Sequence, residues 1–340
     1  MNQHSVVSIN GLNNMINTED KTVLVTGGSG FIGTAICTLL ANAGYNVINL
    51  DRKKKDIAGV TQYPFDIDNH QVAGIIKLTR PDTIVHLAAE HEVGRSVEQP
   101  GVYYQNNVAN TITLLNHAVE CGVKNFIYSS SSTVYGDVSE FPTPEHLAGN
   151  PLNPYGRSKY IVEMMLKDYA DAYGIKFASL RYFNAAGAMP DNSHGYTQDP
   201  ATHLIPILAK AVANDREVDV FGSDYNTADG TAVRDYTHVY DIATAHVSAM
   251  NYLSVDDTES GYFNIGSSSP ASVLDVISKF EEVTGKKVNY KLTDRRPGDT
   301  AQTFADNTKA KTVFGWEPQY TLTDVVEHAW AWETKKKRKK

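Results

Sequence analysis

The sequence predicts an α/β protein built on a doubly wound parallel sheet, with a smaller lobe formed by the C-terminal part of the chain. Between residues 21 and 185, short apolar segments typical of strands alternate with longer segments of helical periodicity. Such alternation is typical of a parallel sheet with helices on both faces. After residue 185 the chain is punctuated by glycine and proline, which indicates loops. A chain of 340 residues is also long for one domain, so a second lobe is expected.

The predicted elements follow from the residues of each segment. β-Branched and aromatic residues mark five strands, at Val23–Thr26, Tyr45–Leu50, Thr83–Ala88, Phe126–Ser130 and Phe177–Phe183. The helices of this part are predicted over residues 33–44, 106–121 and 155–173. The later elements are a strand at Tyr262–Ile265 that returns to the sheet, a helix over 271–284, a strand near 288–292 and a helix over 322–333.

A glycine-rich turn follows the first predicted strand. Gly27, Gly30 and Gly33 recur at every third position between this strand and the next helix, with Phe31 and Ile32 inside the same turn. The first glycine permits a tight turn, the second lets the backbone approach a pyrophosphate, and the third lets the helix pack closely on the strand. An anion bound there would meet the positive end of the helix. The turn therefore predicts a Rossmann-type dinucleotide site.

Asp51 ends the second predicted strand, close to the offset of about 20 residues expected for a carboxylate on the ribose hydroxyls. It indicates NAD as the cofactor, because a carboxylate there would repel a 2′-phosphate. Arg52 and Lys53–Lys55 leave NADP open as the weaker alternative. The ligand is expected beyond the carboxyl ends of the strands, where Ala88, Ala89 and Ser129 also fall.

Tyr155 and Lys159 are spaced to lie on one face of a helix, one turn apart. Asn153 is the predicted N-cap of this helix and Pro154 its first residue. A free tyrosine has a pKa near about 10, and a neighbouring ammonium group favours the phenolate and lowers this pKa. The pair therefore predicts a phenol that removes a proton from an alcohol.

The composition argues against several classes of protein. Six of the positive charges lie in Lys335–Lys340, so the rest of the chain is more acidic than the net charge of −8 indicates, and nucleic acid is not an expected partner. The two cysteines, Cys37 and Cys121, support neither a disulfide framework nor a metal site. No apolar stretch approaches the roughly 20 residues of a membrane span, and none resembles a signal peptide. We therefore expect a cytoplasmic protein without metal or membrane partner.

The ordered set of motifs resembles the extended short-chain dehydrogenase/reductases, and among them the UDP-glucose (UDP-galactose) 4-epimerases. The resemblance runs from about Lys21 to Trp332. It rests on the segments Thr26–Gly33, Asp66-Ile67, Val93–Ser96, Asn106-Asn107, Ser129–Gly136, Tyr155 with Lys159, Leu180–Gly187, Asp229–Val239 and Arg296–Asp299.

The resemblance implies reversible epimerisation at C4 of UDP-hexoses through a transient 4-keto sugar and NADH. It gives Tyr155 the role of the base, Ser131 that of a relay for the substrate proton, and Lys159 contacts with the ribose and the phenolate; Ser130 and Ser132 remain alternatives to Ser131. The implied cofactor contacts are Gly27, Gly30, Phe31, Ile32, Gly33, Asp51, Asp66 and Ile67 at the adenine, Leu87, Ala88, Ala89, Asn107 on the pyrophosphate side, Ser129, Tyr155, Lys159 and Phe183. The implied substrate contacts are Ser131, Tyr155, Asn184, His203, Leu204, Phe221, Arg234, Arg296, Asp299 and Thr303.

Three positions vary in ways that bear on the implied function. His91, within Glu90–Glu92, stands where a lysine near the nicotinamide ribose is common in the family, and His203 stands where an asparagine is common beside the uridine diphosphate. Thr303 matches a position that gates the sugar pocket, where a bulky tyrosine confines the enzyme to plain hexoses. A threonine there implies room for N-acetylated sugars as well.

The pattern and composition of the chain indicate its organisation. We expect a flexible leader over residues 1–20, an NAD-binding Rossmann domain over 21–185 to which 235–268 return, a substrate-binding lobe over 186–334 and a solvated basic tail over 335–340. The resemblance implies a homodimer through the helices around 104–121 and 155–172. Its seam residues would be Val108, Ile112, Leu115, Ile161 and Met165, unless these side chains face the sheet.

Two other activities remain as alternatives. A related nucleotide-sugar 4,6-dehydratase commonly carries an Asp-Glu pair directly before the segment that matches Val134–Gly136, and here Ser132 and Thr133 stand in its place. Dehydration is therefore disfavoured; a decarboxylase is another relative of this kind. A non-catalytic NAD-binding protein on the same fold is the third possibility, since a fold alone does not decide function.

Overall fold

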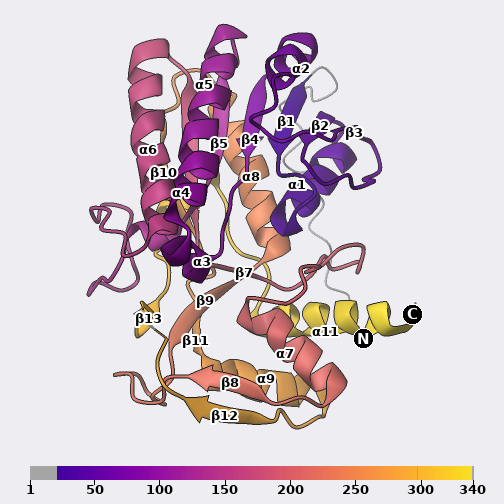
Figure 1. The fold of residues 1–340 in the computed structure, drawn as a ribbon, viewed down its shortest axis with the longest axis vertical. Coiled ribbons are helices and arrows are strands. Elements are labelled where there is room, and N and C mark those ends of the chain that lie inside the picture. Colours follow the sequence, from indigo (N-terminus) through magenta and orange to yellow (C-terminus); the bar gives the residue numbers. More distant parts are fainter. Residues whose placement is uncertain (1–20, 297, 339–340) are drawn as a thin grey trace.

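The computed structural model describes residues 21–296 and 298–338, and its centre is a seven-stranded parallel sheet (Figure 1). The strand order is β10-β6-β5-β4-β1-β2-β3. Strands β2 and β3 are added on one side of β1 and the later strands on the other side, as in a Rossmann-type fold. The strands are β1 (Thr22–Thr26), β2 (Asn46–Leu50), β3 (Val60–Tyr63), β4 (Thr83–His86), β5 (Asn125–Ser131), β6 (Lys176–Tyr182) and β10 (Gly261–Ile265). The predicted fold class is confirmed.

The five strands expected in the first part of the chain are all present, with ends that differ by one or two residues. The predicted return strand is β10, which pairs with β6 at the sheet edge. Strand β3 is an edge strand that the sequence did not reveal, because none of its four side chains is fully buried and its apolar pattern is correspondingly weak.

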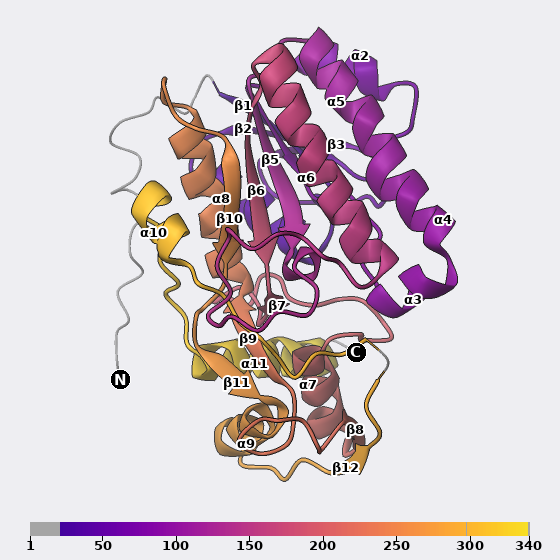
Figure 2. The same ribbon diagram turned by 90° about the vertical axis from the view of Figure 1, so that its left-hand side faces the viewer.

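Helices cover both faces of the sheet (Figure 2). On one face α1 (Phe31–Asn42) packs beside α8 (Val239–Leu253), and their apolar side chains share a core with β1 and β6. On the other face lie α2 (Val72–Thr79), α5 (Asn110–Glu120) and α6 (Pro154–Tyr173), over a second core. The sheet is thus buried on both sides, as parallel sheets require.

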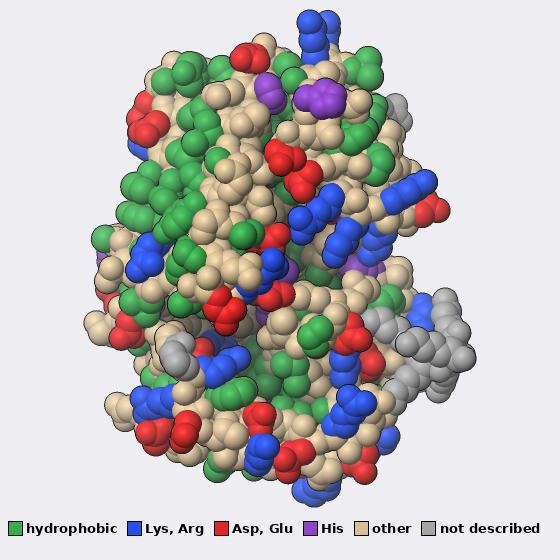
Figure 3. All heavy atoms as spheres, in the orientation of Figure 1, with side chains coloured by type: hydrophobic (Ala, Val, Ile, Leu, Met, Phe, Trp, Pro, Cys, Tyr) green, Lys and Arg blue, Asp and Glu red, His purple; other side chains and the backbone are tan. Residues whose placement is uncertain are grey.

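The smaller lobe lies beyond the carboxyl ends of the central strands, at the bottom of Figure 1. One sheet in it consists of β7 (Asn184–Ala186), β9 (Val233–His238), β11 (Pro270–Ser272) and β13 (Gln302–Thr303). A second consists of β8 (Val218–Phe221) and β12 (Tyr290–Thr293). The helices that enclose its own core are α7 (Leu204–Asn214), α9 (Val273–Thr284) and α11 (Leu322–Arg338), while α10 (Thr308–Phe314) packs against α8 and β10. Figure 3 shows charged side chains and histidines gathered where the part that contains the central sheet meets the smaller lobe.

Two helical segments differ from the expectation. The helix expected over 106–121 is preceded by α3 (Val93–Glu98) and α4 (Pro100–Tyr103), and its first turn is a π-helix over Tyr104–Ala109. At the other end of the chain, α11 continues to Arg338, so residues 335–338 of the expected tail are helical. Lysine and arginine are good helix formers, and the ammonium group of Lys335 donates to the carbonyl oxygen of Asn192 at 2.7 Å. The expected leader and residues 339–340 lie outside the described residues, and the boundary between the two proposed domains stays a prediction.

Candidate active site

Tyr155 and Lys159 lie at the carboxyl edge of the sheet, in the first two turns of α6. The predicted cap is confirmed: the Asn153 side chain accepts a hydrogen bond from the Gly156 amide at 2.9 Å, and Pro154 is the first helical residue. Gly156 allows the helix to begin close to the strand end, because a Cβ atom there would lie 2.7 Å from the carbonyl oxygen of Thr133. Tyr155 is thereby brought beside Ser131 at the end of β5.

The hydrogen bonds of the serines in β5 distinguish their roles. Ser130 turns inward and donates to the carboxylate of Glu163 at 2.7 Å. Ser131 accepts from the amide of Thr133 at 3.2 Å and from its hydroxyl at 3.0 Å. Because both contacts use its lone pairs, the Ser131 hydroxyl proton is left for its hydrogen bond with Tyr155. The hydroxyl of Ser130 is thus engaged with Glu163, whereas that of Ser131 lies beside Tyr155.

The electrostatics of the pair differ from the expectation. Burial raises the pKa of Tyr155 to about 12, and the hydrogen bond with Ser131 opposes this rise. Lys159 was expected to lower this pKa, but its ammonium group donates to the carbonyl oxygen of Ser129 at 2.7 Å and lies 5.8 Å from the centroid of the Tyr155 ring. Burial also lowers the pKa of Lys159 to about 7, so the lysine carries less positive charge than a free one.

The glycine turn after β1 has the shape that a dinucleotide needs. Gly27 has φ +73°, and a Cβ atom there would lie 2.7 Å from the Ala88 nitrogen. A Cβ atom at Gly33 would lie 2.2 Å from the carbonyl oxygen of Gly27, so the helix packs directly on the turn. Gly30 is the N-cap of α1; no side chain caps the helix there, and its first turn contains no acidic residue. The backbone amides in the first turn of α1 are therefore available to an anion, so the glycine turn and the start of α1 fit the pyrophosphate of NAD.

The acids near the adenine end lie beside this turn. Asp51 accepts hydrogen bonds from the amides of Ser29 at 3.0 Å and Lys53 at 2.7 Å, which fixes its carboxylate next to the turn. Asp66 accepts from the amide of Ile67 at 2.8 Å. The Ile67 side chain itself is buried in the core beneath α2, so any contact with the adenine falls to the backbone around it and to Asp66.

Asn107 holds the loop after β4 rather than facing a ligand. Its side chain is 2 % exposed; it accepts from the amide of Glu90 at 2.8 Å and donates to the carbonyl oxygen of Glu90 at 3.0 Å and to Ser158 at 2.9 Å. Its role on the pyrophosphate side is therefore indirect, through the loop that contains Leu87, Ala88 and Ala89. The π-helix aims Asn107 at this loop, and such helices are frequent at functional sites.

Several expected substrate residues come together in the smaller lobe. The Arg296 guanidinium lies 4.7 Å from the centroid of the Phe221 ring, and its Nε donates to Asp299 at 3.1 Å. Arg234 donates to the carbonyl oxygens of Val233 and Thr300, and burial lowers its pKa while Asp299 raises it. Thr303 pairs in register with Arg234 across β13 and β9, and its hydroxyl lies 3.0 Å from that of Thr300.

The rings of His91 and His203 face each other. The rings of His91 and His203 are stacked with centroids 6.3 Å apart, and Tyr196 connects His203 to Phe31 of the glycine turn through ring contacts of 5.6 Å on each side. Burial lowers the pKa of His203 to about 4. His203 and Leu204 begin α7, Asn184 begins β7, and Phe183 packs among buried aromatic and aliphatic side chains next to Tyr135. These residues lie between the cofactor turn and the smaller lobe.

A buried ion pair beneath the site was missed by the sequence analysis. The Arg181 guanidinium contacts the Glu163 carboxylate at 2.7 Å, and their side chains are 4 % and 1 % exposed. The hydroxyls of Ser130 and Ser179 also donate to Glu163, and Arg181 donates to the hydroxyl of Tyr135. Two signals were available: Glu163 continues the spacing of Tyr155 and Lys159 along one helix face, and Arg181 is a lone charge in an apolar strand.

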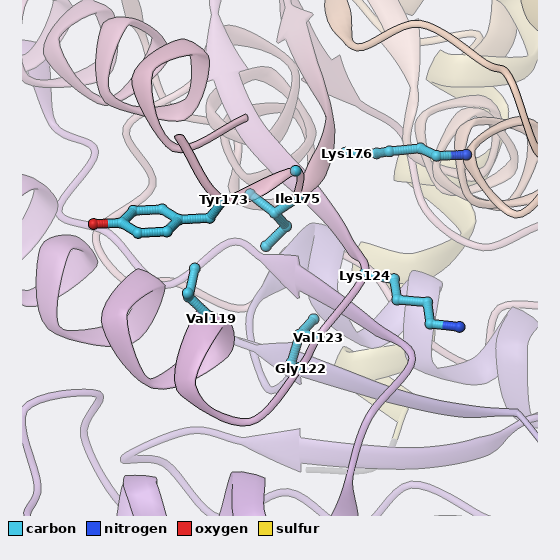
Figure 4. A pocket seen from close by; sticks show the side chains of 8 residues that line it. Val119, Gly122, Val123, Lys124, Tyr173, Ile175 and Lys176 are labelled. Carbon is cyan, nitrogen blue, oxygen red and sulfur yellow. The ribbon is translucent and has the colours of Figure 1, made fainter. Parts of the chain in front are cut away.

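The opposite end of the sheet offers no comparable chemistry. A hollow of about 280 Å³ lies there, where α5 and α6 end and β5 and β6 begin, and it is lined by Val119, Gly122, Val123, Lys124, Tyr173, Gly174, Ile175 and Lys176. Figure 4 shows that the side chains of Tyr173, Lys124 and Lys176 do not converge on a common point. Among the described residues there is no group of three or more potential metal ligands, and no helix long and apolar enough to cross a membrane.

Comparison with known proteins agrees with this geometry. The family model "NAD dependent epimerase/dehydratase family" matches residues 23–266. The chain belongs to this family. A UDP-glucose 4-epimerase of Halalkalibacterium halodurans is 43% identical over 317 residues, which cover 91% of this chain and 95% of that protein.

Solved structures of the family are similar along nearly the whole chain. The UDP-glucose-4-epimerase of Stenotrophomonas maltophila, with bound NAD and formylated UDP-arabinopyranose, has a TM-score of 0.90 at 36% identity and covers 94% of this chain and 100% of that one. The UDP-Glc/GlcNAc 4-epimerase of Campylobacter jejuni has a TM-score of 0.80 at 34% identity, with coverages of 93% and 99%.

Proposed function

We propose that this member of the epimerase/dehydratase family is a UDP-hexose 4-epimerase that uses NAD and interconverts UDP-galactose and UDP-glucose. The observation that carries the proposal is the placement of Tyr155, Ser131 and Lys159 between a dinucleotide turn and the arginines of the smaller lobe. Relatives about 40% identical are UDP-glucose 4-epimerases, and related structures contain NAD. We also propose that the enzyme acts in the cytoplasm, where its two free cysteines would stay reduced.

Residues beside the central sheet transfer the proton, and arginines of the smaller lobe bind the nucleotide. Tyr155, in its phenolate form, takes the proton of the sugar C4 hydroxyl, with Ser131 as the relay, and as the phenol it returns the proton after the transient 4-keto sugar has turned over. When bound, NAD would supply the acceptance of a hydride from the sugar C4 and its later return to the same carbon. Arg234 and Arg296 suit the diphosphate, because guanidinium groups donate paired hydrogen bonds to phosphates. Binding at the nucleotide retains the substrate while its hexose rotates.

The neighbours of Ser131 argue against dehydration. Thr133 occupies one of the positions where a dehydratase needs an acid, and its hydroxyl donates to Ser131 instead. Epimerisation is tested by incubating the protein with UDP-galactose or with UDP-N-acetylgalactosamine and separating the epimers. We expect UDP-glucose to form from UDP-galactose. Binding of the nucleotide sugar without any turnover would instead support a non-catalytic protein.

We expect the range of substrates to include N-acetylated hexoses, with Thr303 as the gate. The Thr303→Tyr variant should lower kcat/KM for UDP-N-acetylglucosamine by at least about 10- to 200-fold, because this is the effect of a single methylene group in a substrate pocket and a tyrosine ring fills more space. It should keep activity on UDP-glucose. A Thr303→Ser variant is the matched control and should keep both activities. Equal loss of both activities in the tyrosine variant would remove Thr303 from this role.

We further propose a homodimer that pairs the outer faces of α5, α6 and the turns before them. Leu115 of the expected seam is buried in the sheet core, and Val108 and Met165 pack against that core. The apolar side chains exposed on these elements include Val97, Tyr104, Ile112 and Met164, and Ile161 of the expected seam is half-buried. Figure 3 shows hydrophobic side chains gathered over α5 and α6 at its upper left, in the orientation of Figure 1. A dimer would cover them.

The dimer is tested by light scattering at micromolar concentration. Wild-type protein should have twice the mass of one chain, and the Ile112→Glu variant should shift toward the monomer because it places a charge in the seam. Leu78→Glu, a comparable change at an exposed residue of α2, is the control and should leave the mass unchanged. A wild-type protein that is monomeric throughout would refute the assembly.

A further inference from the structure

Arg52 is the residue that leaves the choice between NAD and NADP open. It follows Asp51 directly at the end of β2, and a guanidinium group beside the ribose is well suited to bind a 2′-phosphate. In the structure this guanidinium has two carboxylate neighbours. NH2 lies 3.2 Å from Glu90 on the loop after β4, and NH1 lies 3.7 Å from Asp66 on the loop after β3. A phosphate would have to compete with both for the charge of Arg52.

We propose that Glu90 selects for NAD over NADP by holding the guanidinium group of Arg52 and withholding it from a 2′-phosphate. The inference rests on the proposed function, because it concerns the cofactor of that same site.

Contacts other than the ion pair with Arg52 hold Glu90 in position. Both polar groups of its backbone are bound by the buried amide of Asn107, which is itself tied to Ser158 on α6. The Glu90 side chain is only 16 % exposed, and its second oxygen lies 3.4 Å from Arg95. A carboxylate fixed in this way loses little conformational entropy when it pairs. The Arg52 side chain is 58 % exposed, so the contact stabilises by no more than a surface ion pair, about 1 kcal/mol at most.

Lys55 does not replace Arg52. The ammonium group of Lys55 is directed to the other side of the turn, where it donates to Thr34 at 2.9 Å and contacts the His194 ring at 3.0 Å. The backbone amide of Lys53 donates to the Asp51 carboxylate at 2.7 Å. Arg52 is thus the basic group whose position Glu90 controls.

The test compares the cofactors that the protein retains. Each variant is incubated as purified with an equimolar excess of NAD and NADP and freed of unbound nucleotide; the retained cofactors are then released by denaturation and separated by chromatography. Wild-type protein should retain mainly NAD. Glu90→Gln should raise the ratio of NADP to NAD by about two- to fivefold, the equivalent of one ion pair of up to about 1 kcal/mol. The ratio is independent of general losses of affinity or of folded protein.

Two further variants separate the action through Arg52 from a change in overall charge. Glu92→Gln removes the same charge two residues away, where the carboxylate accepts from Gln198 at 2.7 Å, and it should leave the ratio unchanged. In an Arg52→Ala background, Glu90→Gln should also have no effect. An unchanged ratio in the single variant, the same rise with Glu92→Gln, or a rise that persists without Arg52 would each overturn the inference alone. Wild-type protein that retains NADP as well as NAD would overturn it together with the proposed cofactor.

Discussion

Replacing Tyr155 by phenylalanine is expected to lower kcat for epimerisation by about 10²- to 10⁴-fold, the usual contribution of a general acid–base group. The substitution removes only the hydroxyl that exchanges a proton with the sugar, and the ring still packs at the start of α6. Retention of NAD should therefore be largely unchanged. The measurements are the rate of conversion of UDP-galactose and the amount of NAD released on denaturation.

Tyr103 provides the matched control for this substitution. Its ring contacts that of Tyr155 edge-on at 6.4 Å, but its hydroxyl donates to the backbone carbonyl oxygen of Glu92 at 2.6 Å. Tyr103→Phe makes the same chemical change next to the site without removing the base, so turnover should stay within a few-fold of the wild-type rate. Turnover near the wild-type rate in Tyr155→Phe would assign the base to another residue.

The fold could be predicted because its signals are local. The glycine spacing at Gly27, Gly30 and Gly33 predicts a tight turn, and in the structure backbone atoms leave no room for a Cβ atom at Gly27 or Gly33. The apolar strands on either side predict a parallel sheet. The start of α6 is likewise specified by two adjacent residues, Asn153 as the N-cap and Pro154 as the first helical residue. Such signals depend on the chain nearby and not on what packs against it.

The parts that could not be predicted depend on contacts between distant segments. The spacing of Tyr155 and Lys159 predicts a shared helix face, but it does not reveal that the lysine reaches the Ser129 carbonyl and is fully buried. The distance between His91 and His203 is similarly invisible along the chain, since 111 residues separate them in sequence and only the folded sheet and lobe stack their rings. The contact of Asn107 in the π-helix with the backbone of Glu90 is likewise a tertiary contact.

The buried pair of Glu163 and Arg181 leads to the largest expected effect on stability. Glu163→Gln should lower the free energy of unfolding by about 3–5 kcal/mol, because it leaves the guanidinium group of Arg181 buried without its counter-charge. The same carboxylate accepts from Ser130 and Ser179, so the change also weakens the end of β5 that carries Ser131. The measurement is equilibrium unfolding in urea, at saturating NAD for every variant, since a bound ligand adds to apparent stability.

An exposed pair on the same helix shows what burial contributes. Lys167 donates to Asp171 at 2.6 Å, with side chains that are 58 % and 64 % exposed, so Asp171→Asn makes the same change of carboxylate to amide in water. Its expected cost is at most about 0.5 kcal/mol. If Glu163→Gln cost no more than Asp171→Asn, the buried pair would not stabilise the fold. If the double variant Glu163→Leu/Arg181→Met regained most of the stability, the loss in the single variant would be due to the unpaired charge. The pair would then serve to position β6 against α6 instead of adding net stability.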